Sequence, residues 1–184
     1  MRWLLLLTWI CGAVHASAVP RLTLAEMADG SEYIVDATVL RSWTAWDAPH
    51  RFIWTHYELS VSEWLKAPVA SDRTIVVSEP GGTADGVTMV ADNATPYALG
   101  ETIVVLAWRT PEGFLRAAGY GQGKFTVTGF SGSCDRRLRW SPHVIDRLRD
   151  AREPDERLDG MRLDDFKFYM RRFVRFDGQR RTAE

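Results

Sequence analysis

The segment GYGQGKF at residues 119–125 combines glycines with a lysine, a composition that could hold a phosphate group. A Walker-type loop needs G-x-x-x-x-G-K followed by Ser or Thr, but Ala118 replaces the first glycine and Phe125 replaces the hydroxyl residue. The dinucleotide pattern G-x-G-x-x-G fails because Lys124 stands where its third glycine should be. The following run KFTVT predicts a strand, whereas both phosphate motifs require a helix. We therefore interpret the glycines as a turn, with Lys124 on the surface and no phosphate site.

The only closely spaced histidines are His50 and His56, which would face the same side of one strand. Zinc needs three or four converging ligands. Asp47 and Glu58 could contribute, but no cysteine and no helical histidine pair accompanies them. We predict no metal site and no cofactor.

The candidate nucleophiles lie after the last predicted strand. The sequence FSGS at residues 130–133 does not match the G-x-S-x-G pattern of an activated serine. Cys134 lies close to Arg136 and Arg137, which would favour its thiolate, but no second cysteine is present in the mature chain to resolve an oxidised form. We predict no catalytic residue, and the chain is not expected to be an enzyme.

Aromatic residues gather around one predicted strand pair and form the candidate binding face. This face consists of Trp43, Trp46, Phe52, Trp54 and His56. Aromatic faces on small barrels can stack on sugars or bases. The alternative, which we prefer at this stage, is that the same residues are buried beneath two C-terminal helices.

The elements that carry these residues are mainly strands. The capping-box spacing of Thr23 and Glu26 predicts a short helix that ends near Gly30. Strands are predicted over residues 33–40, 51–66, 74–78, 87–91, 102–108, 114–118 and 124–128. Short strands separated by turns, without helices between them, exclude a parallel α/β sheet and favour a small antiparallel β-barrel or sandwich.

The periodicity becomes helical after residue 140. A first helix is expected around Val144, Ile145 and Leu148, followed by a linker at residues 153–155. A second helix has an apolar stripe at Leu163, Phe166, Met170 and Phe173. We predict that this stripe docks on the strands, because the chain from residue 19 to 134 is acidic and the remainder is basic. The organisation is thus a β-barrel domain over residues 19–133 and a helical extension over residues 134–184.

The N-terminal sequence MRWLLLLTWICGAVHASA has the features of a secretory signal peptide over residues 1–18, with cleavage after Ala18. No later stretch is long and apolar enough to span a bilayer. Arginines and acidic residues alternate in the C-terminal part, which is typical of a solvated helical surface and does not indicate nucleic-acid binding. We expect a secreted or periplasmic protein.

The succession TLAEM, YIVDATV, THYELSVSEWLKA, VSEPGG, PYALGETIVVLAW and GYGQGKFTV resembles a family of uncharacterised exported bacterial proteins over residues 21–128. Its order is similar to that of oligonucleotide/oligosaccharide-binding (OB) barrels, including the netrin-like inhibitors of metalloproteases. The resemblance implies a small OB-like antiparallel barrel with a short N-terminal helix. Those inhibitors chelate zinc through an N-terminal cysteine, whereas this mature chain would begin at Val19.

These observations favour an exported, non-enzymatic binding or envelope-associated accessory protein. Its partner would be a secreted protein or a glycan. The alternative function, suggested by topology, is regulation or inhibition of a secreted metalloprotease.

Overall fold

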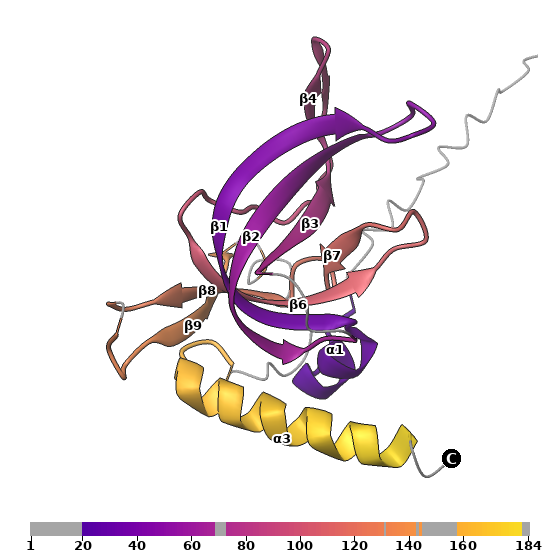
Figure 1. The fold of residues 1–184 in the computed structure, drawn as a ribbon. Helices are drawn as coiled ribbons and strands as arrows, with labels where there is room; N and C mark the ends of the chain where they lie inside the picture. The colour runs from indigo at the N-terminus through magenta and orange to yellow at the C-terminus, as the bar shows by residue number, and fades with distance from the viewer. Residues whose placement is uncertain (1–19, 69–72, 131, 143, 145–157, 182–184) are drawn as a thin grey trace, which may run out of the picture.

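The computed structural model describes residues 20–68, 73–130, 132–142, 144 and 158–181 (Figure 1). The described helices are α1 (Leu24–Gly30) and α3 (Leu163–Arg181). The described strands are β1 (Tyr33–Trp46), β2 (Ile53–Lys66), β3 (Thr74–Pro80), β4 (Gly82–Ala84), β5 (Val87–Met89), β6 (Thr102–Arg109), β7 (Leu115–Ala117), β8 (Lys124–Thr128) and β9 (Arg137–Trp140). The expectation of a mainly β, antiparallel protein with an N-terminal helix is confirmed.

The main sheet has the order β3-β2-β1-β6-β8-β9, and β7 also pairs with β6. β4 and β5 form a separate two-stranded sheet. The ladder between β1 and β2 shifts register near Ile34, Asp36 and Val39. Such bulges bend a strand pair, and the two strands curve away from the helices in Figure 1. We call the outer part of this pair, residues 41–58, the β1–β2 arm.

Helix α1 begins at the predicted capping box. The Thr23 hydroxyl accepts from the Glu26 backbone N–H at 3.2 Å, and the Thr23 backbone N–H donates to the Glu26 carboxylate at 2.8 Å. Both interactions satisfy N–H groups that have no partner within a helix. Leu24, Met27 and Ala28 are buried, so the cap fixes which side of α1 packs on the sheet.

Two apolar clusters lie on opposite faces of the sheet, because successive strand residues point to opposite sides. The sheet cluster contains Val35 and Val105 and is built almost wholly from strand residues. The helix-side cluster contains Ile34 and Val104 together with buried residues of α1 and α3.

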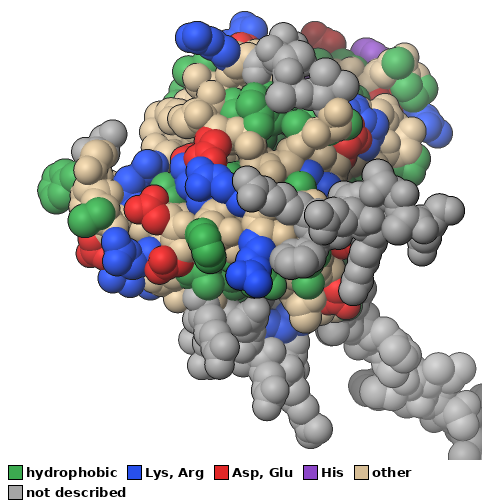
Figure 2. Space-filling view, turned by 60° about the horizontal axis from the view of Figure 1, so that its bottom comes forward, with side chains coloured by type: hydrophobic (Ala, Val, Ile, Leu, Met, Phe, Trp, Pro, Cys, Tyr) green, Lys and Arg blue, Asp and Glu red, His purple; other side chains and the backbone are tan. Residues whose placement is uncertain are grey.

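Helix α3 docks on the sheet through its predicted stripe. Leu163, Phe166 and Met170 are buried, and Phe173 is partly buried against the helix-side cluster. Lys167 Nζ lies 2.5 Å from Asp36 on β1 and 3.0 Å from Glu63 on β2. Figure 2 shows acidic and basic side chains intermixed on the side of the molecule where α3 lies. The prediction that the basic helix docks on the acidic sheet is therefore confirmed.

The rest of the predicted extension differs from expectation or is not described. Strand β9 was not predicted, yet it pairs with β8 and places Leu138 and Trp140 in the helix-side cluster. The first predicted helix and the linker at residues 153–155 lie outside the described residues, apart from Val144. None of the described helices is long and apolar enough to cross a membrane.

The glycine-rich segment forms turns, as predicted, but the chain does not reverse there. β7 and β8 both pair antiparallel with β6, one after the other along its length. They therefore form a single strand that residues 119–122 interrupt as a bulge. At Gly123 a Cβ would lie only 2.8 Å from the Leu106 carbonyl oxygen, which explains the glycine.

The prediction that Lys124 lies on the surface is wrong. Its residue is only 3% exposed, and Nζ lies 2.5 Å from a Glu101 carboxylate oxygen and 3.3 Å from the Thr126 hydroxyl. Because β8 pairs with β6 immediately after the bulge, the lysine belongs to the sheet and not to an exposed turn.

Candidate functional site

The register of three strands brings aromatic side chains onto one face of the β1–β2 arm. Trp43 on β1 is opposite His56 on β2, and His56 is opposite Ser78 on β3. Residues directly opposite each other project from the same side of a sheet. The rings of Trp43 and His56 are 5.3 Å apart. Trp54 is two residues before His56 and therefore shares this face.

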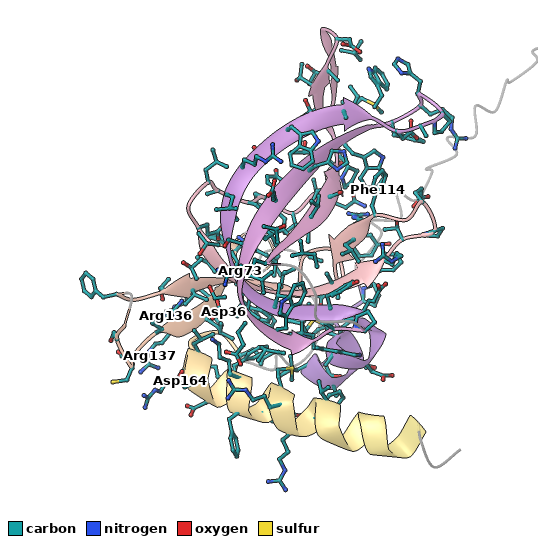
Figure 3. The ribbon with its side chains drawn as sticks, viewed as in Figure 1. Asp36, Arg73, Phe114, Arg136, Arg137 and Asp164 are labelled. Carbon is teal, nitrogen blue, oxygen red and sulfur yellow. The ribbon has the colours of Figure 1, made fainter. Side chains whose placement is uncertain are left out.

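A fourth ring comes from the loop between β6 and β7. Phe114 lies 4.7 Å from Trp54 and 5.5 Å from His56, measured between ring centroids. Figure 3 shows Phe114 beside the arm. Sequence reasoning missed this residue, because only the tertiary fold brings the loop to the arm. We refer to Trp43, Trp54, His56 and Phe114 as the aromatic cluster.

Cations border the aromatic cluster at both ends. The Arg41 guanidinium lies 5.1 Å from the Trp43 ring centroid and is 2.5 Å from Glu58. The Arg116 guanidinium lies 5.9 Å from the Trp54 ring centroid. Both distances are within the range of cation–π attraction, so each indole is held in place by a charged neighbour.

The cluster is open at one end and closed at the other. Trp43 is 39% exposed, whereas Trp54 is only 8% exposed. His56 lies between them, and its Nδ1 is 2.8 Å from the Ser78 hydroxyl. Burial lowers the pKa of His56 from its ordinary value, so this ring is neutral at pH 7. The cluster thus offers an exposed indole next to uncharged hydrogen-bonding groups.

The two other residues of the candidate binding face do not join this cluster. Trp46 is on the opposite face of the arm, where it stacks on His50 at 4.3 Å and donates to Asp85 at 3.1 Å. Phe52 precedes β2 at the arm's tip and is exposed. The predicted five-residue face is therefore divided between two sides and the tip of the hairpin.

The preferred interpretation that the C-terminal helices bury these aromatics is not supported by α3. This helix contacts the opposite end of the strand pair, at Asp36 and Glu63. In Figure 3, Asp36 is next to α3 and Phe114 is at a distance from it. Trp43 consequently remains partly exposed, and the burial of Trp54 involves the β6–β7 loop.

The candidate metal and nucleophile residues are also separated. His50 lies in the turn before β2 with a positive φ, so it does not share a strand with His56 as expected. No group of three potential ligands occurs among the described residues. Cys134 is exposed with a free thiol.

Comparisons with models of protein families, with curated proteins and with solved structures find no match to this chain.

Proposed function

We propose that this chain is an exported, non-enzymatic binding module with an OB-like barrel, and that its ligand is a glycan bound at the aromatic cluster. The observation that carries the proposal is the convergence of rings from β1, β2 and the β6–β7 loop around a partly exposed Trp43. Residues from separate segments converge in this way at binding sites.

The strand order supports the barrel. β1 lies between β2 and β6, β2 leads to β3, and β6 leads to the interrupted strand β7–β8. β7 in turn contacts β3, and Arg116 on β7 forms an ion pair with Glu79 on β3 at 3.0 Å. The contact between β7 and β3 would bring the last part of the sheet back to its first strand, β3, and so close the barrel, as an OB-type fold requires.

The chemistry of the cluster supports a glycan. The apolar faces of sugar rings stack on exposed indoles, and OB-type barrels bind oligosaccharides on their strands and loops. Arg41, His56 and Ser78 supply polar groups beside Trp43. The proposal of metalloprotease regulation rests on topology alone, and the following experiment also separates it from glycan binding.

The test is binding of the mature protein to a panel of soluble neutral and acidic oligosaccharides, measured by calorimetry. Trp43→Ala should weaken binding at least about fivefold, since stacking on an aromatic ring contributes about 1–3 kcal/mol. Trp108→Ala is the matched control, because Trp108 is 36% exposed but lies on β6 outside the cluster. Absence of any Trp43-dependent glycan binding, or inhibition of a metalloprotease in its place, would overturn the proposal.

A further inference from the structure

A cleft of about 610 Å³ lies between the loop before β6, strand β8 and the end of β9. Its apolar residues include Pro96, Tyr97, Ala98 and Pro142, and its volume is in the range of pockets that hold small molecules. None of the residues that line it belongs to the aromatic cluster. The cleft is therefore a second candidate site, separate from the proposed glycan site.

The most buried residues of the cleft form an ion pair within the protein. Lys124 Nζ lies 2.5 Å from a Glu101 carboxylate oxygen, and the two side chains are only 3% and 12% exposed. The Thr126 hydroxyl donates to the same carboxylate. These two charges compensate each other inside the sheet, so a ligand in the cleft would meet them as a neutral surface.

The exposed charges among the described lining residues are Arg139 and Asp159. Arg139 is opposite Thr126 in the ladder between β8 and β9, so its side chain projects from the same side of the sheet. Arg139 Nη1 donates to Asp159 Oδ2 at 3.2 Å, and the two side chains are 51% and 32% exposed. The Trp140 backbone N–H donates to Asp159 Oδ1 at 3.0 Å and fixes this carboxylate. A cation and an anion thus lie side by side next to an apolar wall.

A ligand that matches this arrangement carries both charges and an apolar body. A free amino acid has its carboxylate and its ammonium group on one carbon, so the first can accept from Arg139 while the second donates to Asp159. Its side chain can then pack against Tyr97 and the prolines. A simple carboxylate or a simple amine fits less well, because each brings a like charge close to one member of the pair.

We propose that this cleft binds a free amino acid with a large apolar side chain, whose charged groups are held by Arg139 and Asp159. The inference goes beyond the proposed glycan binding and does not depend on it, because the two sites share no residue.

The first test is calorimetric titration of the mature protein with L-phenylalanine. Glycine should bind at least about tenfold more weakly, because it has no side chain to bury against the apolar wall. Arg139→Gln and Asp159→Asn should each weaken binding of L-phenylalanine at least about tenfold, since hydrogen bonds between charged groups are the strong ones. Asp159→Asn keeps an acceptor for the Trp140 backbone N–H, so its melting temperature should remain that of the wild type.

Arg137→Gln and Asp135→Asn are the matched controls. These residues form an ion pair at 2.7 Å near the same strand, but neither lines the cleft. Both variants should bind L-phenylalanine with wild-type affinity.

The second test uses phenylpropionate, which lacks the ammonium group, and phenylethylamine, which lacks the carboxylate. Each should bind the wild type at least about tenfold more weakly than L-phenylalanine, because one charged hydrogen bond is lost. Asp159→Asn should bind phenylpropionate at least as tightly as the wild type does, since a like charge is removed. Arg139→Gln should do the same for phenylethylamine. A purely structural effect of these variants would instead weaken all three ligands together.

Failure of the wild type to bind L-phenylalanine at millimolar concentration would overturn the proposal. Equal affinity for L-phenylalanine and either analogue would also overturn it, because the site would then recognise a single charge. Binding that Trp43→Ala abolishes and Arg139→Gln leaves unchanged would place the amino acid on the aromatic cluster and contradict the cleft. Glycan binding should be the same in Arg139→Gln, Asp159→Asn and the wild type, so the proposed function is tested separately.

Discussion

Lys124 is a buried cation whose charge is matched by one carboxylate. Its Nζ lies close to Glu101 and is 5.3 Å from the Tyr97 ring centroid. Burial alone would raise the pKa of Glu101, but hydrogen bonds from the Ala98 backbone and Lys124 lower it below its ordinary value. Glu101 is therefore ionised at pH 7, and the ion pair is sensitive to the loss of either partner.

We expect Lys124→Met to destabilise the protein by about 3 kcal/mol, because it leaves the Glu101 charge poorly compensated. Glu101→Gln is the partner variant, and the double variant should lose less stability than the sum of the two single variants. Urea unfolding measures all three. A surface role for Lys124 would be supported if Lys124→Met unfolded at the wild-type urea concentration.

Among individual residues, the sequence identified part of the candidate site. Trp43, Trp54 and His56 were expected together, since residues near a predicted strand pair lie close in space. Trp46 was placed with them wrongly, because it is three residues after Trp43 in an unbroken part of the ladder and therefore projects from the opposite face. Phe114 and the Glu79–Arg116 pair depend on contacts between distant segments, which local patterns do not encode.

Helix α3 is the element whose role follows most directly from sequence. Its apolar residues recur at three- and four-residue steps, and all of them face the sheet. Strand β8 matched its predicted bounds for a similar reason, since its alternation is regular. β4 and β9 were not predicted, because β4 begins in the glycine pair after Pro80 that indicates a turn, and β9 carries two arginines among its four residues. The equally short β5 and β7 lie within predicted strands, so composition and not length hid the other two.

Docking of α3 predicts different effects for two phenylalanines on the same helix. Phe166→Ala should destabilise the protein by about 3 to 5 kcal/mol, because it leaves a cavity in the helix-side cluster. Phe168→Ala should stay within about 0.5 kcal/mol, since Phe168 is 67% exposed. Thermal unfolding followed by circular dichroism measures both. Equal melting temperatures for the two variants would show that α3 does not dock on the sheet in solution.

The ion pairs beneath α3 predict a pH dependence. Burial would raise the pKa of Glu63, but hydrogen bonds from Arg171 and Lys167 outweigh it and lower the pKa below its ordinary value of 4.5. A lowered folded-state pKa stabilises the protein above that value, and the contribution is lost as the pH falls through the folded-state pKa. The stability difference between wild type and Glu63→Gln should therefore shrink below pH 4.5.

Glu112→Gln is the control for this pH dependence, because Glu112 is exposed in the β6–β7 loop. The difference in unfolding free energy between Glu112→Gln and wild type should stay near zero over the same pH range. If the difference in unfolding free energy between wild type and Glu63→Gln is constant from pH 7 to below 4.5, these ion pairs do not contribute to docking of α3.

The whole molecule combines an acidic sheet with a basic helix at one end and an aromatic cluster on the arm at the other. The separation leaves the arm accessible while α3 and α1 complete the core. Sequence composition predicted the charge asymmetry but not this spatial arrangement, because the curvature of β1 and β2 arises from bulges at particular residues.

We predict that folding does not depend on a bound metal. Adding a chelator to the purified protein should leave its melting temperature unchanged, since structural zinc requires several converging ligands. Differential scanning calorimetry with and without chelator measures this. A large decrease that added zinc reverses would show that His50 and His56 bind a metal despite their positions on different sides of the arm.

The central claim is that a glycan binds the aromatic cluster, and titration followed by NMR of the indole N–H groups tests it most directly. Saturating the protein with the oligosaccharide it binds should shift the Trp43 and Trp54 signals and leave those of Trp108 and Trp140 in place. Trp140 is a suitable internal reference, because its indole N–H donates to the Gln122 carbonyl at 2.8 Å away from the arm. Shifts confined to Trp108 or Trp140, with Trp43 and Trp54 unmoved, would contradict the account.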